Sequence, residues 1–193
     1  MAGHAPAFAL FDTPIGRCAI VWRGDSIVGA ALPGATAEVT RSYLQRRFPE
    51  AEERPAPEPI GQAIGMIVRL LEGEAVDFSA VHLALDEAAP FERAVYAEAL
   101  AIPHGETRTY GELARAIGEP GAARAVGRAL GRNPIPIIIP CHRILAADGR
   151  SGGFSAPGGV TTKMRLLAIE RARRGREPSL FDDLGWGTAP ARP

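Results

Sequence analysis

The chain contains only two cysteines, Cys18 and Cys141, among its 193 residues. Two thiols are too few for a disulfide framework or for a zinc site built from cysteines. No stretch approaches the ~18 consecutive apolar residues that a membrane-spanning helix requires. The first residues show no charged segment followed by a long apolar run, so no signal peptide is predicted. The expected location is cytoplasmic, and no membrane partner is expected.

Lysine is nearly absent, because Lys163 is the only lysine among 22 basic side chains. The formal net charge of zero hides an uneven distribution. Residues 1–90 carry 7 basic and 12 acidic side chains (net −5), residues 91–176 carry 14 and 7 (net +7), and residues 177–193 carry 1 and 3 (net −2). A positive field on one part of a chain favours nucleic-acid binding, and arginine suits bidentate phosphate contacts. A solvated basic face would give the same counts.

The first 86 residues are predicted to form a small α+β unit without recognisable chemistry. Residues 18–22 and 26–30 show the pattern of two strands joined by a tight turn at 23–25. The further expected elements are a helix over 36–48, a proline-rich linker over 49–59, a helix over 60–71, and short strands over 76–78 and 81–85. Cys18 falls inside the first strand and is interpreted as a structural residue.

Helices dominate the region after Pro90. The spacing of apolar residues predicts a helix over 91–101, with proline in its first turn. Thr109 is expected to cap a helix over 110–117, and after a Gly-Glu-Pro-Gly break at 118–121 a further helix is expected over 122–131. Helix, short turn and helix is the pattern of the helix-turn-helix motif. An ordinary pair of packed helices would give the same pattern.

The helix expected over 122–131 combines small residues with an arginine stripe. Arg124, Arg128 and Arg132 recur at every fourth position, and most other residues are alanine or glycine. Glycine inside a helix costs about 1 kcal/mol relative to alanine, which suggests close approach to another group. So slim a helix could enter the minor groove of DNA, about 6 Å wide. Packing of the small residues against a neighbouring helix is the structural alternative.

The stretch 133–143, Asn-Pro-Ile-Pro-Ile-Ile-Ile-Pro-Cys-His-Arg, is the most informative part of the chain. Three isoleucines between prolines predict a short buried strand that ends at Pro140. Cys141 would then stand at a rigid strand end, followed directly by His142 and Arg143. Imidazole and cationic neighbours lower the pKa of a thiol, so Cys141 is predicted to be a nucleophile. An inert buried cysteine is the alternative.

This stretch resembles the active-site signature of the O6-alkylguanine-DNA alkyltransferases, and the resemblance covers at least residues 90–172. It implies an α+β protein. A small N-terminal α/β (ribonuclease-H-like) domain would span 1–86. A helical domain with a winged-helix-like helix-turn-helix and the active-site cysteine would span 90–174, and a tail would span 175–193.

The resemblance also implies a reaction. Cys141 would attack the alkyl carbon of O6-alkylguanine in duplex DNA, with O4-alkylthymine left open as a second substrate. His142 would draw the thiol proton through a water, and Glu170 would orient the histidine. The thioether product is not regenerated, so one turnover per molecule is expected. No cofactor and no metal are expected, and the protein is expected to act as a monomer.

The resemblance assigns DNA contacts as well, because such proteins flip the target base out of the duplex. Arg124 would take the place of the flipped base, Tyr110 would crowd the target phosphate, and Asn133 would tie the helix-turn-helix to the active site. The carbonyl of Ile144, with that of Cys141, would accept the guanine amino group. The other residues expected at the DNA or substrate are Ala125, Arg132, Phe154 and Ser155.

Two features depart from the family pattern. The loop 151–159 is longer than usual, with Phe154 as the aromatic wall of the site and Ser155 as a donor to O6. The tail residues 177–184 faintly resemble peptides that bind sliding clamps. A non-catalytic protein that binds alkylated DNA remains an alternative, although a tryptophan replaces the cysteine in such relatives. A thiol peptidase is a third possibility that would not explain the arginine stripe.

Overall fold

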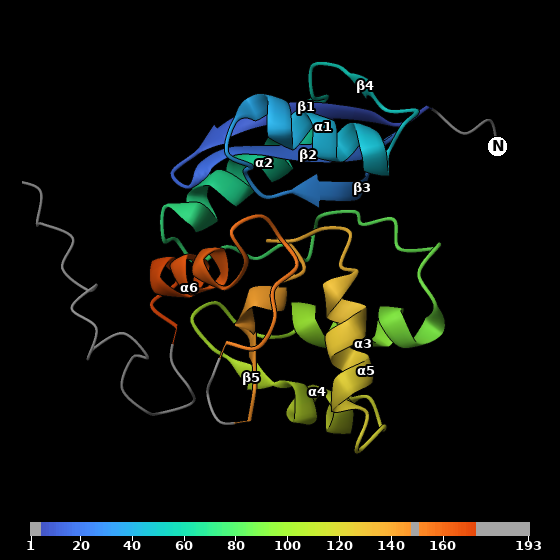
Figure 1. Ribbon diagram of the computed structural model, residues 1–193. Coiled ribbons are helices and arrows are strands. Elements are labelled where there is room, and N and C mark those ends of the chain that lie inside the picture. The colour runs from blue at the N-terminus through green and yellow to red at the C-terminus, as the bar shows by residue number, and fades with distance from the viewer. Residues whose placement is uncertain (1–4, 148–150, 173–193) are drawn as a thin grey trace, which may run out of the picture.

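A four-stranded sheet with helices forms one half of the protein, and a group of helices forms the other half (Figure 1). The structure is a computed structural model that describes residues 5–147 and 151–172. The sheet order is β3-β2-β1-β4, and the helices α3, α4, α5 and α6 lie on one side of it. The chain is therefore a mixed α+β protein, as expected from the sequence.

Strands β1 (Ala7–Thr13), β2 (Gly16–Arg23) and β3 (Ser26–Ala31) form an antiparallel meander, which confirms the predicted hairpin. Side chains of β2 alternate between two cores, because successive residues of a strand point to opposite faces. Cys18 and Ile20 join the core that contains helix α2 (Glu58–Leu71), and Val21 joins the core that contains helix α1 (Ala37–Arg47). The two helices thus cover opposite faces of the sheet.

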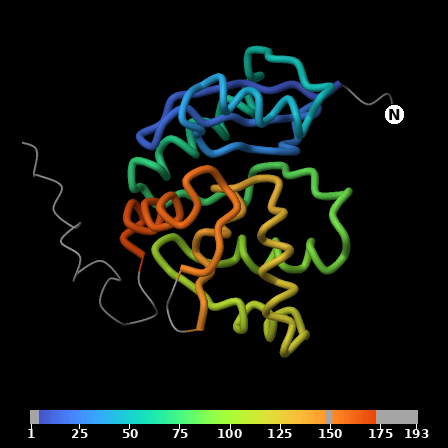
Figure 2. Tube along the Cα trace, viewed as in Figure 1, coloured from blue at the N-terminus to red at the C-terminus, as the bar shows by residue number. Residues whose placement is uncertain are grey.

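Residues 72–89 run along the boundary between the sheet and the helical half (Figure 2). The strands predicted at 76–78 and 81–85 are wrong, because only an isolated bridge between Ile27 and Leu83 forms there. The carboxylate of Asp77 accepts hydrogen bonds from the backbone and hydroxyl of Ser79, which turns the chain away from an extended path. Within the predicted linker, β4 (Glu52–Glu53) pairs with β1.

The helical half confirms three predicted helices. They are α3 (Pro90–Leu100), α4 (Tyr110–Ala116) and α5 (Ala123–Gly131). Thr109 caps α4 as predicted, in a reciprocal capping box with Glu112. The turn between α4 and α5 places Gly118 and Gly121 at positive φ, where glycine is favoured.

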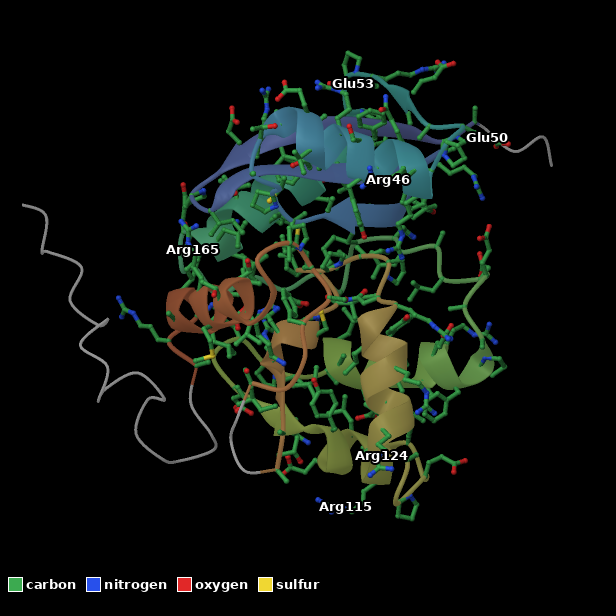
Figure 3. All side chains as sticks on the ribbon, viewed as in Figure 1. Arg46, Glu50, Glu53, Arg115, Arg124 and Arg165 are labelled. Carbon is green, nitrogen blue, oxygen red and sulfur yellow. The ribbon has the colours of Figure 1, made fainter. Side chains whose placement is uncertain are left out.

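The remaining elements surround the stretch 133–143. The 3₁₀ helix η1 (Cys141–Arg143) leads into β6 (Ile144–Leu145), which pairs in parallel with β5 (Arg108–Thr109). Helix α6 (Gly159–Ile169) packs against η1. Its residue Arg165 donates hydrogen bonds to the carbonyls of Pro14 and Ile15, so α6 also holds the sheet (Figure 3).

Candidate functional site

A closed turn, rather than the predicted strand, presents Cys141. The side chain of Asn133 accepts a hydrogen bond from the Ile135 amide at 2.9 Å and donates one to the Ile139 carbonyl at 2.8 Å. Ile137 adopts a φ of 78°, which a β-branched residue rarely does. The strand prediction is wrong because these bonds fold the isoleucines back on themselves. Asn133, which follows α5 closely in the chain, thus holds together the turn that precedes Cys141.

Cys141 is 9% exposed and stands at the start of η1. Burial raises its pKa, while a hydrogen bond from Asn133 and the charge of Lys163 act in the opposite direction. The expectation of a lowered thiol pKa is therefore wrong for the unbound protein. Burial outweighs the neighbouring groups because it disfavours the charged thiolate.

His142, Arg143 and Glu170 form a buried network behind the cysteine. Nε2 of His142 lies 2.9 Å from Oε1 of Glu170. Arg143 donates to both carboxylate oxygens, from Nε at 2.8 Å and from Nη2 at 2.9 Å. Burial alone would raise the pKa of Glu170, but His142 and Arg143 outweigh it and hold that pKa well below its usual range. Glu170 is thus a carboxylate held in place by two partners.

The orientation of His142 leaves one ring nitrogen available. With the carboxylate next to Nε2, the tautomer that fits has its proton on Nε2, which donates a hydrogen bond to Glu170. The other nitrogen, Nδ1, is buried and has no hydrogen-bond partner among the residues that the structure describes. A lone pair at Nδ1 can accept a proton, so the geometry is that of a base with its orienting group.

Lys163 is a site residue that the sequence reasoning missed. Its side chain is fully buried in α6, and its ammonium donates to the Ile144 carbonyl at 2.5 Å. The ammonium also lies 5.7 Å from the centre of the Tyr110 ring. Burial lowers its pKa to about 8, against the opposing effect of the Cys141 thiolate. The one signal in the sequence was that Lys163 is the single lysine among basic residues that are otherwise all arginine.

A cavity of about 850 Å³ opens beside the thiol. Its lining brings together the predicted residues Tyr110, Arg124, Cys141, Phe154 and Ser155. The volume lies in the usual range for a small-molecule site. Cys141 lies at the wall of this cavity, so an alkyl carbon held inside it could meet the sulfur.

Two glycines shape the wall of the cavity around Tyr110. A Cβ at Gly127 of α5 would meet the tyrosine ring at 3.7 Å, and one at Gly152 would meet its hydroxyl at 2.9 Å. Gly152 also has a φ of +63°. The glycine in the middle of α5 thus marks close approach to another side chain, as its sequence suggested. The longer loop packs directly on Tyr110 through Gly152.

Four of the residues expected at the DNA or substrate have other contacts or lie outside the cavity lining. The Ser155 hydroxyl donates to the Gly131 carbonyl at 3.0 Å, and the Ile144 carbonyl already accepts from Lys163. Arg132 lies outside the cavity lining and pairs with Glu92 at 3.2 Å. Ala125 likewise does not line the cavity.

The basic face of the helical half is formed by exposed arginines. Arg124 and Arg128 on α5 are exposed, as is Arg115 on α4. Arg115 and Arg124 lie at the same end of the helical half, remote from the sheet (Figure 3). Since Arg124 and Arg128 also line the cavity, a polyanion bound on this face would pass the mouth of the site.

Within residues 5–147 and 151–172, no three His, Cys, Asp or Glu side chains are grouped as a metal site would require. Over the same residues, no helix has the length and apolar character needed to span a membrane.

Comparison with known proteins gives matches along most of the chain. Residues 90–172 match the family model described as the DNA-binding domain of 6-O-methylguanine DNA methyltransferase. The chain is 37% identical to a methylated-DNA–protein-cysteine methyltransferase of Mycobacterium tuberculosis over 175 residues, which cover 91% of this chain and 98% of that protein.

Solved structures of the same kind of protein also match most of the chain. The crystal structure of the O6-methylguanine methyltransferase of Mycobacterium tuberculosis superposes with a TM-score of 0.71 at 36% identity, covering 92% of this chain and 99% of that one. The Mycobacterium tuberculosis protein OGT in complex with DNA gives a TM-score of 0.71 at 34% identity, covering 93% and 98%. The corresponding enzyme of Pyrococcus kodakaraensis gives 0.68 at 27% identity, covering 84% and 98%.

Proposed function

Because this chain belongs to the methylated-DNA–protein-cysteine methyltransferase family, we propose that Cys141 is the cysteine that accepts the alkyl group. The chain acts in DNA repair by transferring an alkyl group from DNA to a cysteine. The contrast between its two cysteines supports the assignment. Cys18 is fully buried, and burial raises its pKa to about 11, whereas Cys141 lines the cavity beside the arginine face.

The proposed step is a direct displacement. The sulfur of Cys141 forms a bond to the alkyl carbon of O6-alkylguanine while the bond between that carbon and O6 breaks. The electron pair of the broken bond stays on O6, and protonation leaves ordinary guanine. Nδ1 of His142 is the proposed acceptor of the thiol proton, through a bridging water, and Glu170 holds the ring. The thiolate therefore forms only as the proton leaves, which suits a thiol whose pKa is raised by burial.

Lys163 is the proposed counter-ion of the developing thiolate. Its ammonium favours the ionised form of Cys141, and it stands in a buried site where charges interact more strongly than in water. For this chain we therefore add Lys163 to the expected set of Cys141, His142 and Glu170.

DNA is the proposed partner of the arginine face. Helix α5 would enter the minor groove, Arg124 would fill the space left by the flipped base, and the cavity of about 850 Å³ would receive that base. Tyr110 and Phe154 would form its aromatic walls. The carbonyls of Cys141 and Ile144 each accept one hydrogen bond already, from the Ile144 amide and Lys163, and each keeps a lone pair for the guanine amino group.

Several finer features belong to the same proposal. For the fold, they are a ribonuclease-H-like domain over 1–86 and a winged-helix-like domain over 90–174. For the activity, they are action as a monomer and a second activity on O4-alkylthymine. The proposed location is the cytoplasm, where the protein would encounter its DNA substrate. Binding of a sliding clamp by residues 177–184, which lie outside the described residues, is also proposed. A clamp pull-down that captures the wild type and a Leu180→Ala/Phe181→Ala variant equally would rule the clamp out.

Stoichiometry tests the proposed function. A fixed amount of duplex with one O6-methylguanine is titrated with protein, and the remaining lesion is measured after digestion. The repaired fraction should rise linearly and end at one lesion per protein, because a thioether is not returned to a thiol. Cys141→Ser should bind the duplex and repair none of it. Repair of several lesions per protein, or repair by Cys141→Ser, would contradict the proposal.

A further inference from the structure

A second cavity, of about 770 Å³, shares no lining residue with the cavity beside Cys141. The segment 74–89 and the end of α3 contribute most of its wall, and Arg143 and His104 contribute polar groups. Its apolar lining includes Val76, Phe78, Val81, Leu83, Leu85 and Leu100.

This second cavity is an apolar surface without a cover among the described residues. Residues 74–89 contain no helix or strand, although six apolar side chains of this segment line the cavity. Leu100 is 38% exposed and is one of only three large apolar side chains that are exposed in the described parts of the chain. Long irregular segments that carry a contiguous apolar patch commonly mark a binding surface.

The described chain ends beside the rim of this cavity. A Cβ at Gly73 would lie 3.3 Å from the Ile169 carbonyl, and one at Gly105 would lie 3.2 Å from the Glu170 carbonyl. Gly105 directly follows His104, which lines the cavity, and Gly73 lies two residues before Ala75, which lines it too. The residues after Ala172 therefore start next to the cavity.

We propose that the C-terminal segment 178–186 of the same chain docks in this cavity, with Leu180 and Phe181 as its anchors. Seven residues separate Ala172 from Leu180 and can span up to about 25 Å. Leu180, Phe181, Leu184 and Trp186 give the segment an apolar character that matches the cavity wall. A short tether gives such a segment an effective concentration of the order of millimolar.

Charge supports this occupant. Arg173, Arg174 and Arg176 lead from Ala172 toward the anchors. Three exposed acidic residues, Glu72, Asp77 and Glu106, lie close in sequence to residues of the rim, together with Glu74, which already pairs with Arg69.

An unpaired polar atom provides a second observation. Nε2 of His104 is buried and has no hydrogen-bond partner among the described residues. Buried polar atoms usually have one. Because Nε2 is itself buried, a carbonyl or an aspartate of the docked segment would become its acceptor only if the ring turned toward the cavity that His104 lines. Docking would also cover the small exposed part of Arg143, which is 6% exposed and holds Glu170.

Hydrogen exchange tests the proposal. Backbone amides of residues 75–85 are compared in the full chain and in a chain that ends after Arg176, which keeps the basic residues but removes the anchors. Exchange should be several-fold faster in the shortened chain, and a synthetic peptide of residues 177–193 should restore the slower rate. Leu180→Ala/Phe181→Ala in the full chain should behave like the shortened chain.

A matched pair of variants locates the effect. Leu100→Glu places a charge in the cavity and should abolish the protection, whereas Val160→Glu places one at another exposed apolar position and should leave it intact. Equal exchange in the full and shortened chains would overturn the proposal. Protection that appears only at high protein concentration, together with a dimer mass in light scattering, would also overturn it, since the occupant would then be a second copy.

Discussion

Replacing Lys163 by methionine tests whether the buried ammonium speeds alkyl transfer to Cys141 while it lowers the free energy of unfolding. Lys163 is fully buried, and its burial lowers its pKa from 10.5 to about 8. This difference corresponds to about 3 kcal/mol by which folding disfavours the charged lysine. Methionine has a similar length and no charge, so Lys163→Met removes that cost.

The sign of the pH dependence follows from proton binding. Between pH 8 and about 10.4 the unfolded chain holds the proton on this lysine while the folded chain releases it, so wild-type stability rises with pH in this window. Below pH 8 the cost of burying the ammonium is fully present. Loss of the hydrogen bond to the Ile144 carbonyl offsets about 1–3 kcal/mol of the gain.

At pH 7 we expect Lys163→Met to be more stable than the wild type by up to about 2 kcal/mol, or roughly 4–8 °C in melting temperature. The gain should disappear by about pH 10, and methyl transfer should be slower because the Cys141 thiolate loses its cation. Chemical denaturation at pH 7 and pH 10 measures the first effect, and single-turnover transfer measures the second.

Arg165→Met is the control for transfer, because it removes a charge from the same helix where the side chain contacts the sheet. Its transfer rate should stay close to that of the wild type. A Lys163→Met variant that is less stable at both pH values by the same amount would refute the reasoning about the ammonium. An unchanged transfer rate would refute the proposed role as counter-ion.

Three further substitutions probe the network, the turn and the DNA face. Glu170→Gln weakens the pairing of buried Arg143 and should cost about 3 kcal/mol in urea unfolding at pH 7. Because the pKa of Glu170 is lowered by folding, the wild type gains stability above the unfolded pKa near 4.3 and loses that stability as the pH falls. The difference in stability between Glu170→Gln and the wild type should therefore shrink in acid. A difference that does not change with pH would contradict this reasoning. Asn133→Ala leaves the buried Ile135 amide unpaired and removes one of the two hydrogen bonds that the Ile139 carbonyl accepts, so it should cost about 2–4 kcal/mol; unchanged stability would contradict its role in the turn. Arg124→Ala should change stability by under about 0.5 kcal/mol yet weaken duplex binding and flatten its salt dependence, and an unchanged salt slope would exclude a phosphate or groove contact.

The sequence predicted the periodic elements well and the active-site turn poorly. The helices over 91–101, 110–117 and 122–131 depend on local spacing and capping, and each formed within a residue or two of its expected bounds. The isoleucine run has an equally strong apolar pattern, but the side chain of Asn133 folds it into a turn. That pairing depends on geometry across six residues, which composition does not reveal.

The electrostatics of the thiol show the same limit. His142 and Arg143 follow Cys141 in the sequence and were expected to lower its pKa, yet both side chains bind Glu170, 27 or 28 residues further along the chain. The cation that does favour the thiolate, Lys163, lies on a different helix. The residues that follow Cys141 in the sequence therefore predicted where the site is. They did not predict which group favours the ionised form of its sulfur.

Peptide mass mapping of the protein after incubation with duplex DNA carrying one O6-methylguanine tests the central claim most directly. The two cysteines serve as each other's control, because Cys18 is enclosed in the sheet and Cys141 lines the cavity. We predict one added methyl group per molecule, carried by the peptide that contains Cys141, and none in Cys141→Ser. A methyl group on any other residue, or complete repair without any added mass, would contradict the account.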